Sequence, residues 1–218
     1  MKKKIKIFIV LIFLTNLLSF QAHSHGIEFT PIAGYTFGDE FNLYGGGYGY
    51  VGDGFTWGAI LSKNINPNYA IEFLYSRQET TGEFSAYDYY TGVSISDYNI
   101  PMTVSYFQIG GCRLAPLGTS GKVEGFGGLN LGIVLFTPKD QKYNYDEEVR
   151  FATEFKLGAK IWMSDKVGLR LQANLQMPIQ SAGVSIYAGS GGISTGVSGF
   201  STITQFGFTG GLIFRLGQ

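Results

Sequence analysis

Residues 168–180, GLRLQANLQMPIQ, alternate between apolar and polar side chains along almost their whole length. Leu169, Leu171 and Leu175 fall on one face, whereas Arg170 and Gln172 fall on the other. A period of two residues predicts a β-strand with two unlike faces. In a soluble protein the apolar face packs into the core. In a barrel that spans a membrane the apolar face meets lipid and the polar face lines the interior.

The first 24 residues indicate the compartment. Four lysines precede an apolar run at residues 7–20, and Ala22 and Ser24 are small residues placed where a leader is cleaved. This pattern predicts a secretory signal peptide at residues 1–24. A retained anchor is disfavoured because the run is short for a spanning helix of about 20 residues. We expect residues 25–218 to form one exported domain.

Charge and cysteine content exclude several classes of protein. Four of the 16 basic residues belong to the signal peptide, whereas all 16 acidic residues remain, so the exported chain carries a net charge of −4. This balance argues against nucleic acid as a partner. Cys112 is the single cysteine and cannot form an internal disulfide or a cysteine-based metal site. The 32 glycines and 16% aromatic residues favour strands with tight bends over helices.

Eight segments have the pattern of strands. They are residues 27–37, 54–64, 69–78, 101–114, 122–136, 150–163, 167–180 and 203–216. Most are longer than the five or six residues of an ordinary soluble strand. They match the 9–11 residues that a tilted strand needs to cross a bilayer.

The connecting segments alternate strictly in length. The short ones are 65–68, 115–121 and 164–166; the long ones are 38–53, 79–100, 137–149 and 181–202. An up-and-down barrel with both termini in the periplasm has short periplasmic turns and long external loops. A soluble sandwich has no reason to place every long loop at one end. The last long loop is rich in Gly and Ser, and we expect it to be flexible.

The polar faces carry charges of both signs. The residues predicted to share the barrel interior are Glu28, Glu72, Glu124, Glu154, Lys156, Lys160, Arg170, Arg215 and Arg113. Four acids against five bases is close to the balance that buried charges require. If the apolar faces formed a soluble core, the same charges would simply be solvated. Phe126 and Trp162 are predicted to point inward beside them.

The segment 101–114 departs from simple alternation. Phe107 and Ile109 have one parity, whereas Cys112 and Leu114 have the other. A β-bulge at residues 110–111 would shift the register and return Arg113 to the interior. The alternative is that the two faces of this strand are assigned wrongly. Pro31 and Pro178 also lie inside predicted strands, which indicates bulges or strand ends there.

Several of these segments resemble a known family. "FTPIAGYTFG" (29–38), "IEFLYS" (71–76), "VGLRLQANLQ" (167–176) and "GGLIFRL" (210–216) are similar to segments of small outer-membrane β-barrels of Gram-negative bacteria, the OmpA/OmpX-like, porin-family barrels. The resemblance covers the exported chain. It implies an all-β, eight-stranded antiparallel barrel in the outer membrane. Its motifs specify the fold much more than an activity.

Residues that could carry chemistry are scarce. Enzymes among small outer-membrane barrels use a histidine as general base, and the two histidines here are His23 and His25, outside every predicted strand and loop. "GYGYVGDG" (47–54) lacks the Lys-Ser/Thr ending of a phosphate loop. We therefore expect no catalytic residues, no cofactor and no metal.

The predicted external loops have a distinct composition. They contain eleven acidic and two basic residues, a net charge of −9. The candidate tyrosines for interaction among them are Tyr44, Tyr48, Tyr50, Tyr87, Tyr89, Tyr90, Tyr143 and Tyr145. Exposed tyrosine beside charge is typical of recognition surfaces. The alternative is that the tyrosines form an interfacial girdle and that the acids keep the loops solvated or bind lipopolysaccharide through divalent cations.

The sequence therefore predicts a monomeric, non-catalytic protein of the outer membrane, in contact with membrane lipid and lipopolysaccharide. Its role is either structural or an interaction with an extracellular ligand or host surface through four long loops. Eight strands leave an interior just wide enough for side chains to fill, which disfavours a wide pore. Two alternatives stay open: a narrow channel or transporter for a small or hydrophobic solute, and a soluble periplasmic barrel that binds a ligand.

Overall fold

The computed structural model describes residues 26–42, 47–88, 93–119, 121–139, 147–179, 184–189, 192–197 and 203–216. The predicted signal peptide lies outside these ranges. Eight long strands form the main body: β1 (Ile27–Thr36), β4 (Gly54–Asn66), β5 (Tyr69–Asp88), β6 (Val93–Leu117), β7 (Val123–Pro138), β8 (Glu148–Trp162), β9 (Val167–Ile179) and β12 (Gln205–Leu216). Four short strands accompany them: β2 (Asp39–Asn42), β3 (Gly47–Val51), β10 (Val184–Gly189) and β11 (Gly192–Val197). No helix in the described part of the chain is long and apolar enough to cross a membrane.

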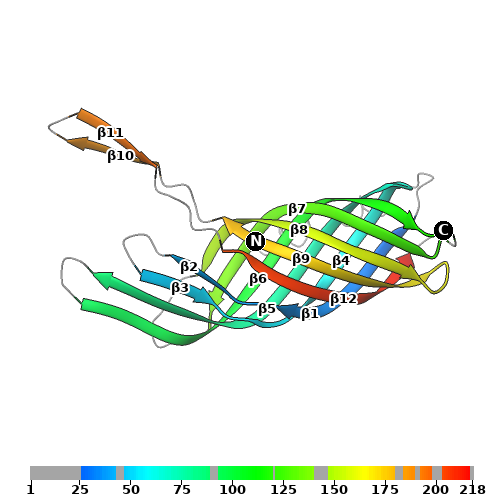
Figure 1. Cartoon of the computed structure of the whole chain (residues 1–218), viewed down its shortest axis with the longest axis horizontal. Helices are drawn as coiled ribbons and strands as arrows, with labels where there is room; N and C mark the ends of the chain where they lie inside the picture. Colours follow the sequence, from blue (N-terminus) through cyan, green and yellow to red (C-terminus); the bar gives the residue numbers. More distant parts are fainter. Residues whose placement is uncertain are drawn as a thin grey trace, which may run out of the picture.

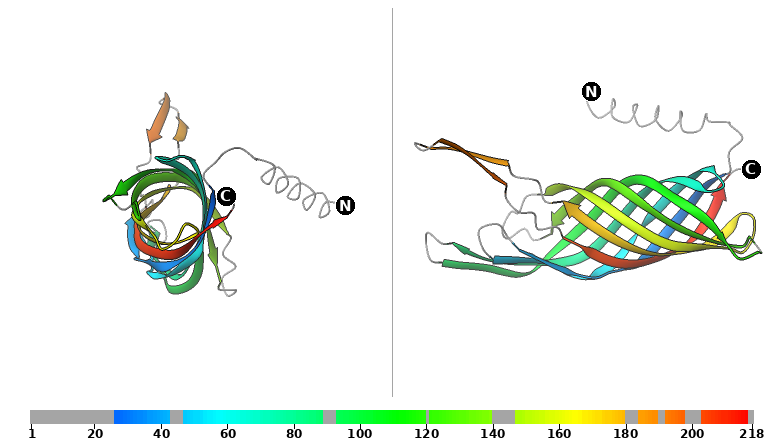
Figure 2. Two further views of the ribbon diagram at one scale, coloured as in Figure 1. Left: turned by 90° about the vertical axis from the view of Figure 1, so that its right-hand side faces the viewer. Right: turned by 45° about the horizontal axis from the view of Figure 1, so that its top comes forward.

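The eight long strands close into an antiparallel barrel. Their order is β4-β1-β12-β9-β8-β7-β6-β5, and β5 pairs with β4 to complete the ring. The end-on view in Figure 2 shows the closed ring, and Figure 1 shows the tilted strands. Each of the eight predicted segments corresponds to one barrel strand, so the predicted fold class is confirmed.

The apolar faces of the strands point outward. Leu171 is 49% exposed on the outer wall, whereas its neighbour Arg170 is 1% exposed and points inward. The exposed apolar side chains of the outer wall include Phe29, Leu61, Phe73, Ile109, Leu131, Leu157, Phe155, Leu212 and Phe214. A protein surrounded by water would have the opposite arrangement. The alternative of a soluble periplasmic barrel is therefore wrong.

Aromatic rings gather on the outer wall toward the end with the long hairpins. Trp57 packs edge-on against Tyr75 with 6.0 Å between ring centroids, and Tyr75 lies 5.0 Å from Phe107. Phe206 and Phe208 pack edge-on at 4.8 Å on β12. Such rings mark the boundary between the hydrocarbon layer and the headgroups.

Inward-facing glycines allow the strands to approach one another closely. A Cβ atom added to Gly132 would lie 2.0 Å from the carbonyl oxygen of Phe107, and one added to Gly158 would lie 2.2 Å from that of Leu171. No side chain fits at such distances. Glycine at these positions is therefore a condition of the tight curvature of this small barrel.

The predicted bulge at residues 110–111 is wrong. Gly110 and Gly111 continue the ladder of β6 with both β5 and β7 without a shift in register. Arg113 consequently faces outward and is exposed, contrary to the predicted interior position. The reason is that the interior contains an apolar cluster at this end, in which Cys112 and Leu114 pack with Ala70 and Phe126. The side chains of this strand alternate between the two faces without a break. The assumption that apolar residues always face outward is therefore wrong for Cys112 and Leu114.

The two prolines behave differently from each other. Pro178 is the penultimate residue of β9, as expected for a strand end. Pro31 lies in the middle of β1, and the register with β12 is the same on both sides of it. The pairing of β1 with β12 is interrupted only between Phe29 and Ile32, because proline has no N–H to donate to β12.

Three of the predicted long loops contain regular structure. The segment 79–100 is mostly a continuation of β5 and β6, which pair as far as Asp88 and Val93. Strands β2 and β3 form a hairpin within 38–53, and β3 pairs with β5. Strands β10 and β11 pair within the segment expected to be flexible. Figure 1 shows these hairpins projecting beyond one end of the barrel.

Candidate functional site

A buried network of charged side chains fills the middle of the barrel around Glu72. Arg170 donates to both carboxylate oxygens, with Nη1–Oε1 2.7 Å and Nη2–Oε2 3.0 Å. The Nζ of Lys156 lies 2.5 Å from Oε2, and the hydroxyl of Ser62 donates to Oε1 at 3.1 Å. The Arg170 guanidinium also lies over the ring of Phe126, 4.1 Å from its centroid. Glu72 thus has two cationic partners and no contact with solvent.

A second cluster surrounds Glu28 at the end with the short turns. Lys160 Nζ lies 2.6 Å from one carboxylate oxygen, and Arg215 Nη2 lies 3.2 Å from the other. The side-chain amide of Asn64 donates to the same carboxylate at 3.2 Å. Arg215 is partly exposed and stacks on Trp162 at 3.9 Å, so it closes this end of the network.

Glu154 is held by amides instead of cations. The amide of Asn130 donates to it at 2.5 Å, and the amide of Gln172 donates at 3.4 Å. Gln172 in turn accepts two hydrogen bonds from Arg170, and Asn130 accepts one from Lys156. Glu154 is therefore linked to the Glu72 cluster through two neutral side chains.

The two clusters together draw on each of the eight barrel strands. One contributor from each strand is Glu28 (β1), Ser62 (β4), Glu72 (β5), Cys112 (β6), Asn130 (β7), Lys156 (β8), Arg170 (β9) and Arg215 (β12). Buried charges are tolerated only when they are paired and hydrogen-bonded, and removal of one partner costs about 3–5 kcal/mol. The Glu72 cluster therefore joins β4 to β9 from within, and the Glu28 cluster joins β1 and β12 to β4 and β8.

The opposite end of the interior is apolar. Its buried cluster consists of Val51, Val104, Tyr106, Val134, Phe136, Ala152 and Ile203, with Phe41 and Met102 packed against it. Val51 comes from β3, and Ile203 lies two residues before the start of β12, so segments from outside the barrel wall contribute to this cluster. The interior thus contains ion pairs in its middle and at the end with the short turns, beside the small apolar cluster of Cys112 and Leu114, and a larger apolar cluster at the opposite end.

Strands β2, β3, β5 and β6 form one sheet that projects beyond the barrel, which we call the projecting sheet (Figure 1). Its base is fixed to the barrel by hydrogen bonds. Gly52 donates its N–H to Thr81 O at 2.7 Å, and Thr80 donates its hydroxyl to Gly52 O at 2.6 Å. The backbone N–H of Thr204 donates to the Asp39 carboxylate at 2.6 Å. The projecting sheet is therefore an extension of the barrel wall.

Charged residues mark the point where β5 leaves the apolar band. Arg77 and Lys139 both pair with Glu79 above the aromatic rings. The hydrogen bond from Lys139, supported by the one from Arg77, holds the pKa of the Glu79 carboxyl below its ordinary value. This exposed cluster lies at the level where headgroups meet water.

The predicted interior residues occupy different positions. Glu28, Glu72, Glu154, Lys156, Lys160 and Arg170 are buried together. Arg215 lies at the rim, Glu124 is half-buried opposite Lys160 and makes no ion pair within the described part of the chain, and Arg113 is outside. The sequence pattern placed Gln172 on the inner face, but Ser62, Asn64 and Asn130, which also satisfy the carboxylates, were missed. Their inward parity was the available signal.

The candidate loop tyrosines are only partly described. Tyr48 on β3 is 38% exposed, and Tyr50 is half-buried. Tyr87 pairs with Ser94 through the backbone of the projecting sheet. Tyr44, Tyr89, Tyr90, Tyr143 and Tyr145 lie outside the described residues.

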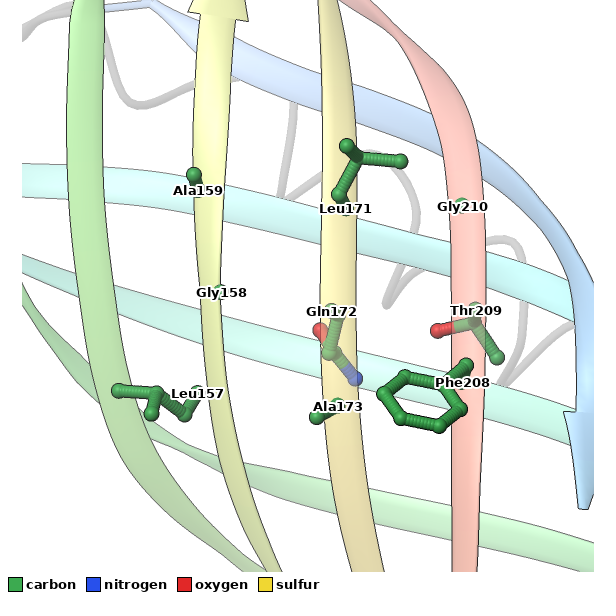
Figure 3. A pocket seen from close by; sticks show the side chains of 9 residues that line it. All are labelled: Leu157, Gly158, Ala159, Leu171, Gln172, Ala173, Phe208, Thr209 and Gly210. Atoms are coloured by element: carbon green, nitrogen blue, oxygen red, sulfur yellow. The ribbon is translucent and has the colours of Figure 1, made fainter.

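A depression of about 710 Å³ lies on the outer wall over β8, β9 and β12 (Figure 3). In one row across the strands Ala173 lies between Leu157 and Phe208, and in the next row Leu171 lies between Ala159 and Gly210. Its position on the apolar wall places it in contact with lipid chains. In the described residues there is no group of three or more His, Cys, Asp or Glu side chains that could hold a metal ion.

Comparison with solved structures identifies the architecture. Neisserial surface protein A is similar with a TM-score of 0.55 and 12% identity, over 89% of this chain and 100% of that one. The outer membrane protein OprG from Pseudomonas aeruginosa is similar with a TM-score of 0.55 and 12% identity, over 91% and 99%. The chain is an integral outer-membrane β-barrel. No family model and no curated protein matches its sequence.

This fold sets the orientation of the elements described above. In outer-membrane barrels the short turns lie in the periplasm and the long connections lie outside the cell. The Glu28 cluster is therefore at the periplasmic end of the barrel. The apolar cluster and the projecting sheet are at the extracellular end.

Proposed function

We propose that this outer-membrane barrel is a non-catalytic surface protein whose projecting sheet binds a positively charged partner, such as a basic protein surface, outside the cell. The observation that carries this proposal is the projecting sheet itself, in which β5 and β6 remain paired far above the barrel and β2 and β3 add to the edge. Ordered strands present side chains at fixed positions, which lowers the entropic cost of binding.

The chemistry of the projecting sheet supports a cationic partner. Glu40 and Asp53 are exposed, Asp39 and Glu83 are half-exposed, and Tyr48 is exposed beside them. Acidic side chains attract a basic partner over long distances, and tyrosine supplies contact area at low entropic cost. Interaction by the surface also agrees with the filled interior.

A narrow channel is the second candidate. The observation in its favour is that Gln108, Asn174 and Gln176, all buried, have side-chain atoms without a hydrogen-bond partner among the described residues. These residues face the interior between the ion pairs and the apolar cluster. Both ends of that region are filled, however, so a continuous path would require movement of Arg170 or of the apolar cluster.

The test uses the purified full chain in nanodiscs of zwitterionic lipid without lipopolysaccharide. Poly-lysine is the cationic probe and poly-glutamate the matched anionic one, with binding followed by fluorescence anisotropy at rising salt. We expect binding of poly-lysine alone, which weakens as salt screens the charges. In one variant a two-residue Asn-Gly turn replaces residues 82–100 between the cross-strand partners Thr81 and Pro101. This variant should insert normally and lose binding.

Two point-variant sets refine the test. Combined Glu40→Gln, Asp53→Asn and Glu83→Gln should weaken binding at least tenfold, and Tyr48→Ala should weaken it at constant charge. Combined Glu147→Gln and Glu148→Gln on the other side of the barrel is the control and should leave most of the affinity. Full affinity in the shortened-hairpin variant would refute a role of the projecting sheet.

A further inference from the structure

Arg113 lies on the lipid-facing wall at the periplasmic end of the barrel. It is exposed, and it is opposite Tyr69, the first residue of β5 after the turn. The next residue, Leu114, donates its backbone N–H to Asn68 O in that turn at 2.7 Å. The Arg113 side chain makes no hydrogen bond and no ion pair within the part of the chain that the structure describes. A cation in this position costs free energy unless it reaches polar headgroups.

The outward-facing residues next to Arg113 on β6 and β7 have no large side chains and form an open floor on the outer wall. Gly111 and Ala115 flank it on the same face of β6, and Gly127 lies opposite it on β7. A Cβ atom on Gly127 would meet its nearest neighbour, Leu157 Cδ1, at 3.5 Å, and a Cβ on Gly111 would also have 3.5 Å of clearance. The inward glycines have no such room. The backbone therefore does not require glycine here, and the open floor leaves space beside the guanidinium.

A second outward-facing cation lies nearby on the same wall. Lys63 on β4 is opposite Ile71 of β5, two residues along from the pair of Tyr69 with Arg113. Tyr69 is 50% exposed between the two cations. Among the described strand residues, no acidic side chain faces outward on the periplasmic half of the wall. Two long cationic side chains beside an interfacial tyrosine can extend toward the phosphates of the inner leaflet.

We propose that Arg113, Lys63 and Tyr69 form a binding site for the phosphate of an anionic phospholipid in the inner leaflet of the outer membrane. The guanidinium fork binds the phosphate through two N–H groups, as arginine does wherever it meets phosphate. The lysine adds charge, and the tyrosine anchors the site at headgroup level. The bare floor formed by Gly111, Ala115 and Gly127 accommodates the lipid beside the arginine.

Native mass spectrometry of the full chain released from nanodiscs containing phosphatidylglycerol and phosphatidylcholine tests this site. The wild type should retain phosphatidylglycerol preferentially. Arg113→Gln should retain about fivefold less, equivalent to about 1 kcal/mol. Arg113→Gln combined with Lys63→Gln should lower retention further. Phosphatidylcholine retention should be the same for all variants, and heat-modifiable gel mobility should confirm that each is folded.

Two controls separate a shaped site from general attraction between charges. Lys166→Gln removes an exposed cation from the periplasmic turn between β8 and β9 and should leave retention unchanged. Gly127→Val keeps every charge but fills the floor beside Arg113, and it should reduce retention. The proposal is overturned if the double variant retains as much phosphatidylglycerol as the wild type. It is equally overturned if Lys166→Gln loses as much as Arg113→Gln, or if Gly127→Val loses nothing.

Discussion

Arg170 joins three residues of the barrel interior. It binds Glu72 through two hydrogen bonds, binds Gln172 through two more and lies over Phe126. Arg170→Leu should lower the free energy of unfolding by about 3–5 kcal/mol, because Glu72 loses its main partner while it stays buried. Urea unfolding in lipid vesicles measures this. Arg113 makes no hydrogen bond or ion pair with the described residues, so Arg113→Gln should change stability by less than about 1 kcal/mol; similar losses in both would contradict the assignment of faces.

Leu171 tests the lipid face directly. It points outward midway along β9, where lipid chains surround it. Leu171→Arg should destabilise the barrel by about 2–4 kcal/mol, the cost of a cation near the bilayer midplane. Leu171→Phe keeps an apolar side chain there and should be tolerated. The measurement is again unfolding in vesicles. Tolerance of Leu171→Arg would mean that water and not lipid surrounds this face of the barrel.

Gln172 is more important than its sequence position suggests. On the alternating pattern alone, Gln172→Ala is expected to be mild, because any polar side chain suits the inner face. Its contacts with Arg170 and Glu154 change that expectation. Loss of the amide leaves buried charged groups with fewer hydrogen bonds, so Gln172→Ala should cost about 1–3 kcal/mol. A loss below 0.5 kcal/mol, in the same assay, would show that the network rearranges around it.

Six of the nine predicted interior charges are buried together, because charge and parity together identify an inward position. The pairings were beyond prediction, since each depends on which strands face one another across the barrel. Glu72 binds Arg170 and Lys156, which are 98 and 84 residues away in the sequence and belong to different strands. No local pattern encodes such a contact.

Among the elements, β6 shows where reasoning from alternation fails. The side chains of β6 alternate between the two faces without a break. Its apolar side chains do not all face outward, however, since Cys112 and Leu114 belong to an apolar cluster in the interior. The extensions of β5 and β6 were missed for a related reason. Above the bilayer both faces of a strand meet water, so the apolar half of the pattern disappears and the segment has the composition of a loop.

Strand β7 offers a matched pair of glycines on opposite faces. Gly132 faces inward against the backbone of β6, whereas Gly127 faces outward with room for a side chain. Gly132→Val should destabilise the barrel by about 1–3 kcal/mol or prevent its assembly, because valine cannot fit without a backbone shift. Gly127→Val should fold as well as the wild type. Folding yield by heat-modifiable gel mobility distinguishes the two, and equal yields would contradict the close strand approach.

At the scale of the whole molecule, side chains fill the interior of the barrel, and its two ends differ in composition. Ion pairs lie in the middle and at the periplasmic end, whereas the larger of the apolar clusters lies at the extracellular end. The extracellular segments are acidic, and outward-facing cations lie near the periplasmic turns. This distribution of charge agrees with the proposals that the protein binds basic partners outside the cell and anionic phospholipid in the inner leaflet of the outer membrane.

The central claim is that the apolar faces meet lipid and the polar faces fill the barrel, and the two tryptophans test it directly. Trp57 is 43% exposed on the outer wall, whereas Trp162 is 9% exposed and lies inside beneath Arg215. Each single-tryptophan variant, Trp162→Phe or Trp57→Phe, is refolded into vesicles of lipid with brominated acyl chains. Bromine quenches tryptophan fluorescence only on contact, so Trp57 should be strongly quenched and Trp162 should keep its emission. Strong quenching of Trp162 with Trp57 unaffected would contradict the account.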